Sequence, residues 1–366
     1  MKVVVAGGGT GGHVTPALAV ARRLIDDHGA TVRFIGSSTG FEATMVPEAG
    51  IEFHGIEVVP LYREVSFRAA RAPFVAARSV GRARALIRGA DVVLGVGGYA
   101  SVPAGIAARR ERIPLVLHEQ NAVPSLSNRV LARWATAIGS TFASAASRFG
   151  RTVRVEHTGN PVRSSILAVP TRRDELATQA REAFRLEADR RTVLVTGGSQ
   201  GALHLDQVIA AALPALAPRP VQLVVVTGRD HVAVVADAVE RGPSPRVHVA
   251  PFLDRIELAY AVADVAVARA GAGSVAELAV CGIPCVLVPY PHATANHQEA
   301  NARELVAAGG AEMIVDRELS PDALVACILG VMDDDARRRS MAQAMRSWAR
   351  PDADVRLAEL VMAVAR

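Results

Sequence analysis

VVVAGGGTGGH (residues 3–13) and VLVTGGSQGA (residues 193–202) decide the fold, because each joins a short apolar strand to a glycine-rich turn that precedes an amphipathic helix. Glycine lets backbone N–H groups approach an anion at the start of a helix, so each turn could cradle a phosphate or a sugar. For either turn alone, a tight strand-to-helix connection without a ligand is the alternative. Two such turns nearly half the chain apart indicate two nucleotide-binding α/β halves that face one cleft.

The first turn also has the spacing G-x-G-x-x-G, through Gly7, Gly9 and Gly12, which occurs in dinucleotide-binding folds. In those folds an acidic residue follows the next strand and binds the ribose. Here the next strand, Thr31–Ile35, is followed by a Gly-Ser-Ser sequence. The missing acid argues against an NAD-dependent dehydrogenase.

A chain of 366 residues, 50% of them hydrophobic, is long enough for two domains with apolar cores. Its formal net charge of +5 favours an anionic partner, which could be a nucleic acid, a membrane surface or a phosphorylated substrate. Because the first strand begins directly after Met1 and Lys2, we expect no secretory signal and an intracellular protein. The longest apolar stretches, 209–217 and 256–268, are too short to span a bilayer, so any membrane contact should be peripheral.

Neither the cysteines nor the acidic residues form a metal-binding pattern. Cys281, Cys285 and Cys327 lie in mostly apolar surroundings without CxxC spacing, which favours buried reduced thiols. The run Asp333–Asp335 lies far from every strand-end motif, so we expect it to cap a helix. No HExxH motif and no paired Cys/His set occurs, and we therefore expect neither a metal nor a cofactor.

Short apolar strands alternate with helical stretches along the chain, for example at residues 114–117, 221–226, 265–268 and 284–288. This alternation predicts parallel sheets with right-handed crossovers. In such sheets ligands bind at the carboxyl ends of the strands, and every motif discussed below follows a predicted strand.

The boundary between the halves is expected within residues 159–171, where GNPVR and a later proline interrupt the alternation. The pattern then restarts, and VLVTGGSQGA is weakly similar to VVVAGGGTGG. We therefore predict an N-terminal domain of residues 1–162 and a C-terminal domain of residues 163–352. A last helix within residues 353–366 could pack back on the first domain.

A third turn, AGAGSVAEL at residues 270–278, brings Ser274 and Glu277 to the start of a helix. Two roles are open for Glu277. It could complete a capping box with Ser274, or its carboxylate could accept hydrogen bonds from both hydroxyls of a ribose.

The segment PYPHATANHQEANA, residues 289–302, is unusually polar for a turn after a buried strand. It brings Asn296, His297, Gln298 and Asn301 close together. Amides donate and accept hydrogen bonds, as sugar hydroxyls do, so a sugar site is one interpretation and a solvated helix start is the other.

In the first half, HEQN begins at His118 after a predicted strand, and GVGGYAS at residues 95–101 follows another. His118, Glu119 and Asn121 could position hydroxyls or move a proton, or His118 could be a structural residue. His13 is better placed as a base, because it lies at a helix start, where a neutral imidazole is favoured over a cation. Arg163 in GNPVR could contact a diphosphate or only a neighbouring carboxylate.

Between Leu61 and Arg88 seven arginines alternate with apolar residues, against the single acid Glu64. With few aromatic side chains for base stacking, this basic amphipathic segment suits an anionic lipid surface better than RNA. A helix with merely solvated arginines is the alternative. The residues that we assign to the membrane or acceptor side are Phe67, Arg68, Arg71, Phe74, Arg78 and Tyr99.

Seven motifs occur in a fixed order over nearly the whole chain: GGGTGGHVTPALAVA, GVGGYAS, HEQN, GNPVR, GGSQGA, AGAGSVAEL and HxxxNHQxxNA. The ordered set closely resembles the MurG family, whose members are peripheral UDP-N-acetylglucosamine (UDP-GlcNAc) transferases that complete lipid II in bacterial peptidoglycan synthesis. The resemblance implies a GT-B fold, in which two Rossmann-like α/β domains have the active site in the cleft between them.

The resemblance also implies the residues that contact UDP-GlcNAc. Arg163 and Ser199 would lie near the phosphates, Leu253 would present its backbone to uracil, and Glu277 would bind the ribose. Gln298 would face the GlcNAc hydroxyls and is preferred over His297 because its spacing to Asn301 is kept. The remaining donor contacts implied are Thr10, Gly11, Gly12, Asn121, Ala272, Gly273, Ser274, Val275 and Ala276.

The implied reaction is an inverting transfer in which the 4-hydroxyl of N-acetylmuramic acid (MurNAc) in lipid I attacks the anomeric carbon of UDP-α-GlcNAc and releases UDP. His13 is the first candidate for the general base and Glu119 the second. The implied partners are UDP-GlcNAc, lipid I and the anionic inner membrane surface on its cytoplasmic side, and no nucleic acid. The alternatives are a transferase with another acceptor, a UDP-GlcNAc epimerase and a non-enzymatic nucleotide-sugar-binding scaffold.

Overall fold

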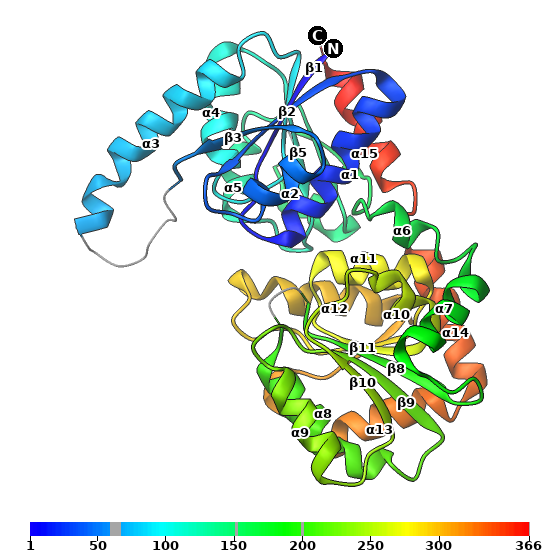
Figure 1. Cartoon of the computed structure of the whole chain (residues 1–366). Helices are drawn as coiled ribbons and strands as arrows, with labels where there is room; N and C mark the ends of the chain where they lie inside the picture. Colours follow the sequence, from blue (N-terminus) through cyan, green and yellow to red (C-terminus); the bar gives the residue numbers. More distant parts are fainter. Residues whose placement is uncertain (59–66, 151–152, 199–200, 366) are drawn as a thin grey trace. The chain divides into compact units, whose positions relative to one another are not determined.

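The computed structural model describes residues 1–58, 67–150, 153–198 and 201–365, and side chains in its third helix from residue 75. The chain forms two compact units (Figure 1). Unit 1 comprises residues 1–163 and 351–366, and unit 2 comprises residues 164–350. The chain thus passes from one unit to the other after Arg163 and after Arg350. The sequence analysis placed these two boundaries after residues 162 and 352.

Unit 1 is built on a seven-stranded parallel sheet with the strand order β3-β2-β1-β4-β5-β6-β7. The strands are β1 (Lys2–Ala6), β2 (Thr31–Ser37), β3 (Glu52–Ile56), β4 (Val92–Gly95), β5 (Leu115–Glu119), β6 (Ala137–Ser140) and β7 (Arg154–His157). The helices are α1 (Gly11–His28), α2 (Glu42–Glu48), α3 (Phe67–Leu86), α4 (Ser101–Glu111), α5 (Leu126–Leu131), the 3-10 helix η1 (Ala143–Arg148) and α15 (Ala353–Val364).

Both faces of this sheet are buried, which explains why its strands are continuous apolar runs. Val3 and Val5 of β1 belong to the core under α1, α2 and α15. Val4 and Ala6 belong to the core under α3, α4 and α5. Successive side chains of a strand point to opposite faces, so four residues of β1 contribute to two cores.

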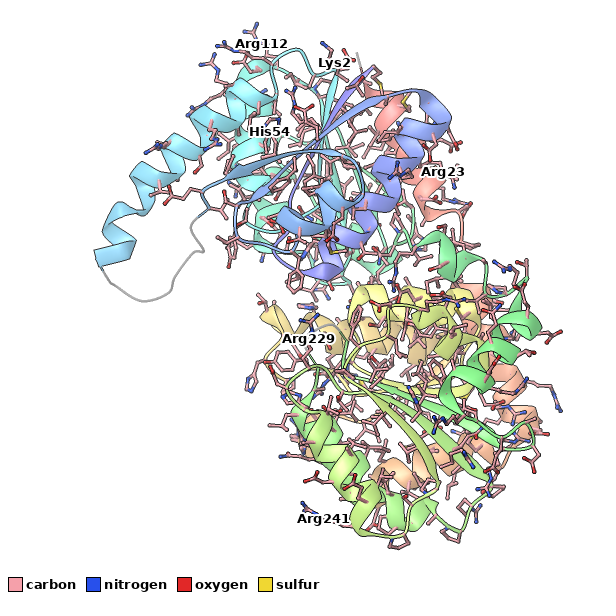
Figure 2. The ribbon with its side chains drawn as sticks, in the orientation of Figure 1. Lys2, Arg23, His54, Arg112, Arg229 and Arg241 are labelled. Atoms are coloured by element: carbon pink, nitrogen blue, oxygen red, sulfur yellow. The ribbon has the colours of Figure 1, made fainter. Side chains whose placement is uncertain are left out.

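The last helix, α15, belongs to unit 1 and lies beside α1 (Figure 1). Leu357 and Val361 of α15 are fully buried in the same core as Val20 of α1. The Asp354 carboxylate accepts hydrogen bonds from the Arg23 guanidinium at 3.0 and 2.8 Å, and Arg23 projects from α1 toward α15 (Figure 2). The chain therefore crosses between the units twice.

Unit 2 is built on a six-stranded parallel sheet with the strand order β10-β9-β8-β11-β12-β13. The strands are β8 (Arg191–Thr196), β9 (Val221–Val226), β10 (Arg246–Ala250), β11 (Ala263–Ala268), β12 (Cys285–Leu287) and β13 (Ala311–Met313). The α-helices are α6 (Ser164–Leu167), α7 (Arg173–Phe184), α8 (Leu203–Leu216), α9 (Val232–Arg241), α10 (Ile256–Val262), α11 (Ala272–Cys281), α12 (His297–Ala307), α13 (Pro321–Met332) and α14 (Asp335–Trp348), and the 3-10 helices are η2 (Thr294–Asn296) and η3 (Asp316–Glu318).

Val193 and Val195 of β8 belong to the core formed with α8 and α13, while α7, α10 and α11 lie on the other side of this sheet (Figure 1).

The predictions for the cysteines and for the acidic run Asp333–Asp335 concern this unit. Cys281 and Cys285 are buried, as predicted, and Cys327 is half-buried. Asp334 caps α14, because its carboxylate accepts the Arg337 N–H at 2.9 Å.

Strand order reverses between β1 and β4 in unit 1, and between β8 and β11 in unit 2. Open parallel sheets bind ligands at such reversal points, outside the carboxyl ends of the strands. Both glycine-rich turns and the turn at residues 269–271 follow these strands. The topology therefore confirms the predicted α/β class with two parallel sheets and indicates where each unit would bind a ligand.

Candidate active site

The first glycine-rich turn packs against the turn that follows β4. Gly7 donates its N–H to the Ile35 carbonyl at 3.1 Å, and Gly8 donates to the Gly97 carbonyl at 3.3 Å. A Cβ atom at Gly98 would lie 2.2 Å from the carbonyl oxygen of Gly8. The glycines therefore serve a close backbone-to-backbone approach as well as the turn itself.

His13 is held at the start of α1 by contacts on two sides. The first residue before the helix is Thr10, whose hydroxyl lies 2.8 Å from Nδ1 of His13. On the other edge of the ring, a Cβ at Gly97 would lie 3.2 Å from Nε2, and Gly97 has a φ of +86° that favours glycine. In the tautomer that donates from Nδ1 to Thr10, Nε2 keeps the lone pair that a general base needs.

His118 is fully buried within a hydrogen-bond network at the carboxyl end of β5. Its Nε2–H donates to the Gly159 carbonyl at 3.1 Å, and its Nδ1 accepts from Nε2 of Gln120 at 3.2 Å. Gln120 also donates to the Val96 carbonyl at 2.8 Å. Burial lowers the pKa of His118 to about 4, so the ring is neutral at physiological pH and acts as a structural residue.

Glu119 is also fully buried, and its carboxylate accepts hydrogen bonds from Asn121, Ser125 and Asn128. One oxygen accepts the Asn121 N–H at 2.9 Å, and the other accepts the Ser125 N–H at 3.0 Å and Nδ2 of Asn128 at 2.9 Å. Burial raises the pKa of Glu119, while these hydrogen bonds oppose the rise. Glu119 therefore shapes the loop that carries Asn121, and its role as the second candidate base stays a prediction.

In unit 2, the capping role considered for Glu277 is wrong. Helix α11 begins after Gly271, and no side chain accepts a hydrogen bond at this cap. Ser274 is thus already the third helical residue, so it cannot be the N-cap of a capping box. Instead, Oε2 of Glu277 accepts the hydroxyl hydrogen of Tyr260 at 2.8 Å. Tyr260 lies on α10 and is 3% exposed, so it orients a half-buried carboxylate from the protein interior.

The amide side chains after β12 have different surroundings. Asn301 is fully buried, and its Nδ2 donates to the Ala270 carbonyl at 3.0 Å, which holds the turn before α11. Gln298 is half-buried, and its Oε1 accepts the Tyr290 N–H at 2.9 Å. This bond fixes the amide orientation, so Nε2 of Gln298 is the atom that could donate to a sugar hydroxyl. His297 bonds locally to the Thr294 carbonyl at 2.8 Å.

The structure groups the other predicted contacts by unit. In unit 1, Thr10 and Gly12 are exposed, Gly11 and Asn121 are half-buried, and Arg163 is exposed at the end of the unit. In unit 2, Leu253 is half-buried after β10, and the start of α11 presents Gly273 and Ser274 at half-buried positions while Ala272, Val275 and Ala276 are buried. Ser199 lies outside the described residues.

Two residues near these sets escaped the sequence analysis. One is Tyr260, the partner of Glu277. The other is Glu42, whose buried carboxylate accepts the Gly9 N–H at 2.8 Å and the Ser37 N–H at 2.7 Å. The signal for Glu42 was Gly36 near the end of β2 and Gly40 before α2, where a Cβ atom would collide with the Glu42 side chain.

Helix α3 is amphipathic in the part whose side chains are described. Val80 and Ala83 are buried, and α3 packs on α4. Arg78 and Arg82 are exposed, and the N-terminal end of α3 extends away from the sheet (Figure 1). The side chains of Phe67, Arg68, Arg71 and Phe74 lie outside the described ones, and Tyr99 on the turn after β4 is 49% exposed. Among the described residues, none of the helices is long and apolar enough to cross a membrane.

The neutral state of His118 predicts an acid-sensitive fold. Between pH 6.5 and about 4 the unfolded chain binds a proton at His118 that the folded chain does not bind. This residue should therefore lower the free energy of unfolding by about 3 kcal/mol as the pH falls through that range. His118→Asn should flatten the dependence, as measured by urea unfolding at several pH values. If the free energy of unfolding had the same slope against pH in the wild type and the variant, His118 would not be the group that stays neutral in the folded protein.

Comparison with known proteins gives a consistent result over both units. Residues 3–140 match the N-terminal domain of glycosyltransferase family 28, and residues 192–357 match its C-terminal domain. A Halothermothrix orenii protein is 40% identical over 371 residues, which cover 99% of this chain and 98% of its own length. A Clavibacter sepedonicus protein is 40% identical over 363 residues, covering 98% of this chain and 95% of its own. Both are named UDP-N-acetylglucosamine–N-acetylmuramyl-(pentapeptide) pyrophosphoryl-undecaprenol N-acetylglucosamine transferase.

Solved structures agree with these relatives. The crystal structure of Acinetobacter baumannii MurG superimposes with a TM-score of 0.79 at 29% identity and covers 99% of each chain. A UDP-GlcNAc 2-epimerase from Neisseria meningitidis, at 14% identity and a TM-score of 0.70 over 99% of this chain and all of its own, shares the fold alone. With its two Rossmann-like units, its full-length relatives and its match to the MurG structure, the chain has the GT-B fold and belongs to the MurG family of family 28 glycosyltransferases.

Proposed function

We propose that this enzyme transfers GlcNAc from UDP-GlcNAc to the 4-hydroxyl of MurNAc in lipid I and thereby forms lipid II. The observation that carries the proposal is the 40% identity, over nearly the full chain, to proteins named for this transfer onto a pyrophosphoryl-undecaprenol acceptor. Both units contribute to the match, which favours this acceptor over a different one.

Donor binding is proposed for the carboxyl end of the sheet in unit 2. The Glu277 carboxylate would accept hydrogen bonds from the ribose hydroxyls, because the Tyr260 hydroxyl already fixes one of its oxygens. The backbone of Leu253 would contact uracil, and Nε2 of Gln298 would donate to a GlcNAc hydroxyl. The start of α11 would favour the anionic diphosphate, because N–H groups and the helix dipole point to it. Arg163 and Ser199 are proposed to contact the phosphates as well.

Proton transfer is proposed for the carboxyl end of the sheet in unit 1. Nε2 of His13 would accept the proton of the attacking 4-hydroxyl while Nδ1 donates to Thr10. The new bond joins that oxygen to the anomeric carbon, and the bond from this carbon to the diphosphate breaks. UDP leaves with the electron pair of that bond. Because the hydroxyl attacks in line, opposite the departing diphosphate, the anomeric configuration inverts and no covalent enzyme intermediate forms.

A peripheral position on the cytoplasmic face of the membrane is proposed for α3. The exposed Arg78 and Arg82 on this helix support the proposal, because basic residues near a surface are attracted to anionic lipids. Such a contact would bring the enzyme to an acceptor that is anchored by its undecaprenyl chain.

The test of the function is UDP release from UDP-GlcNAc by the purified enzyme, with and without a lipid I analogue that carries a shortened prenyl chain. Release that requires the analogue, together with a β-1,4-linked disaccharide product, is the expected result. His13→Ala should lower kcat by about 10²-fold or more while donor binding changes little, because a general base acts only in the transition state. Donor binding without acceptor-dependent release would contradict the transfer, and near-normal turnover of the variant would exclude His13 as the base.

The contact between Tyr260 and Glu277 predicts a selective loss of donor affinity. Tyr260→Phe removes the hydrogen bond but keeps the ring, so the carboxylate should be oriented less well toward the ribose. We expect KM for UDP-GlcNAc to rise by about tenfold, since a hydrogen bond to a charged group contributes roughly 1.5 kcal/mol or more. Steady-state kinetics with UDP-GlcNAc and its 2′-deoxyribose analogue measures this effect. The variant should discriminate less between the two donors, and unchanged discrimination would argue that Glu277 does not bind the ribose.

The role of α3 predicts that its arginines contribute to lipid binding. Arg78→Ala/Arg82→Ala should weaken binding to vesicles that contain anionic lipid by roughly 2 kcal/mol, or about thirtyfold, if each arginine near the surface contributes about 1 kcal/mol. A matched control removes two exposed arginines of unit 2, Arg181→Ala/Arg241→Ala. Cosedimentation measures both variants. Equal binding of the two would show that α3 does not contact lipid.

A further inference from the structure

Glu42 places a carboxylate inside the first glycine-rich turn. It is the first residue of α2, and its side chain has no exposed surface. One oxygen accepts the Gly9 N–H at 2.8 Å, and the other accepts the Ser37 N–H at 2.7 Å. A turn of the kind that binds external anions in nucleotide-binding folds therefore contains an anion supplied by the chain itself.

The surrounding glycines leave the room that this carboxylate occupies. A Cβ atom would lie 2.2 Å from a side-chain atom of Glu42 at Gly8, 2.3 Å at Gly36 and 2.4 Å at Gly40. Real Cβ atoms do not approach other heavy atoms so closely. Three glycines, one in the first glycine-rich turn, one in β2 and one in the turn after β2, thus share Glu42 as a neighbour. Their arrangement depends on the position of this side chain.

The contacts of Glu42 lead to His13 along two short routes. Gly9, which Glu42 binds, precedes Thr10, whose hydroxyl lies 2.8 Å from Nδ1 of His13. Gly8, which Glu42 crowds, donates to the carbonyl of Gly97, and Gly97 lies against the other edge of the His13 ring. Thr10 is therefore bonded to a glycine that contacts Glu42, and Gly97 accepts a hydrogen bond from another such glycine.

We propose that Glu42 is a positioning residue for the transfer reaction. Its carboxylate acts as an internal anion that fixes the backbone of the first glycine-rich turn, so that Thr10 and Gly97 hold the His13 ring in the orientation needed for proton transfer. The Gly9 N–H consequently serves this internal carboxylate instead of a donor phosphate. The activity readout of this inference rests on the proposed function.

Removal of the carboxylate with chemical rescue tests the proposal. Glu42→Ala leaves a space lined by the Gly9 and Ser37 N–H groups, and a small carboxylate such as formate could occupy it. We expect kcat of the variant to fall by about 10²-fold, the effect of misplacing a reacting group by roughly 1 Å, with KM for UDP-GlcNAc nearly unchanged. Formate should restore kcat in a saturable manner in Glu42→Ala, but should have no effect on the wild type.

Two further variants separate positioning from a general effect on folding. Glu42→Gln keeps the shape but directs an amide NH2 at a backbone donor, so it should be impaired and insensitive to formate. Glu48→Ala removes an exposed carboxylate at the other end of α2 and should behave as the wild type. Wild-type kcat in Glu42→Ala and Glu42→Gln would overturn the proposal, as would a loss of kcat that formate does not restore in a variant that still binds UDP-GlcNAc.

A second measurement does not depend on activity. Thermal unfolding of Glu42→Ala should shift to higher temperature with formate, because formate would bind the folded state only, whereas the wild type should not respond. If the wild type fails to turn over with the lipid I analogue, the proposed function fails, and a formate shift would still support the internal anion. The absence of any formate shift in folded Glu42→Ala would contradict it.

Discussion

The close approach of two backbone turns at the carboxyl edge of the first sheet is the constraint on which the rest of unit 1 depends. The carbonyl oxygen of Gly8 occupies the space that a Cβ atom at Gly98 would need. The first glycine-rich turn and the turn after β4 are therefore in such close contact that neither can move without the other. Polar backbone groups brought so close together must all find partners, because a buried unpaired N–H is costly. The Ile35 and Gly97 carbonyls and the Glu42 carboxylate supply those partners. A chemical group on this edge, such as the imidazole of His13, therefore stands on a rigid support.

Much of the polar sequence that marks the family is support of this kind. His118, Glu119 and Asn301 are fully buried and bind backbone groups of the turns that carry other residues. His118 and Glu119 are the last two residues of β5, and Asn301 lies on α12. The backbone groups that they bind lie in turns beside these elements, where donors and acceptors have no partner in regular secondary structure. The motif residues thus divide into those that would face a ligand and those that hold the turn in place. Among their polar side chains, burial separates the two groups, and residue type does not.

The sequence was sufficient for the two parallel sheets, because their strands are apolar runs followed by glycine-rich turns and both patterns are local. Glu277 was recognised as a possible ribose ligand, but its partner Tyr260 was not, since that contact joins two different helices. The capping alternative failed because α11 starts at Ala272, three residues before the position that a Ser274 cap requires. Glu119 was considered as a base because a carboxylate at a strand end suits that role. Only the structure reveals the hydrogen bonds that its carboxylate accepts from Asn121, Ser125 and Asn128.

The return of α15 to unit 1 affects how the protein is made. The core under α1 includes Leu357, Ala358 and Val361, which follow all of unit 2 in the sequence and are therefore translated after it. In the sequence, unit 2 stands between the two parts of unit 1. All of unit 2 is therefore translated before unit 1 has the residues that it needs to complete its fold. Domains generally fold as units during synthesis. The first part of unit 1 would therefore keep part of its apolar surface uncovered until α15 has been translated, and a premature stop before α15 would damage the unit whose translation began first.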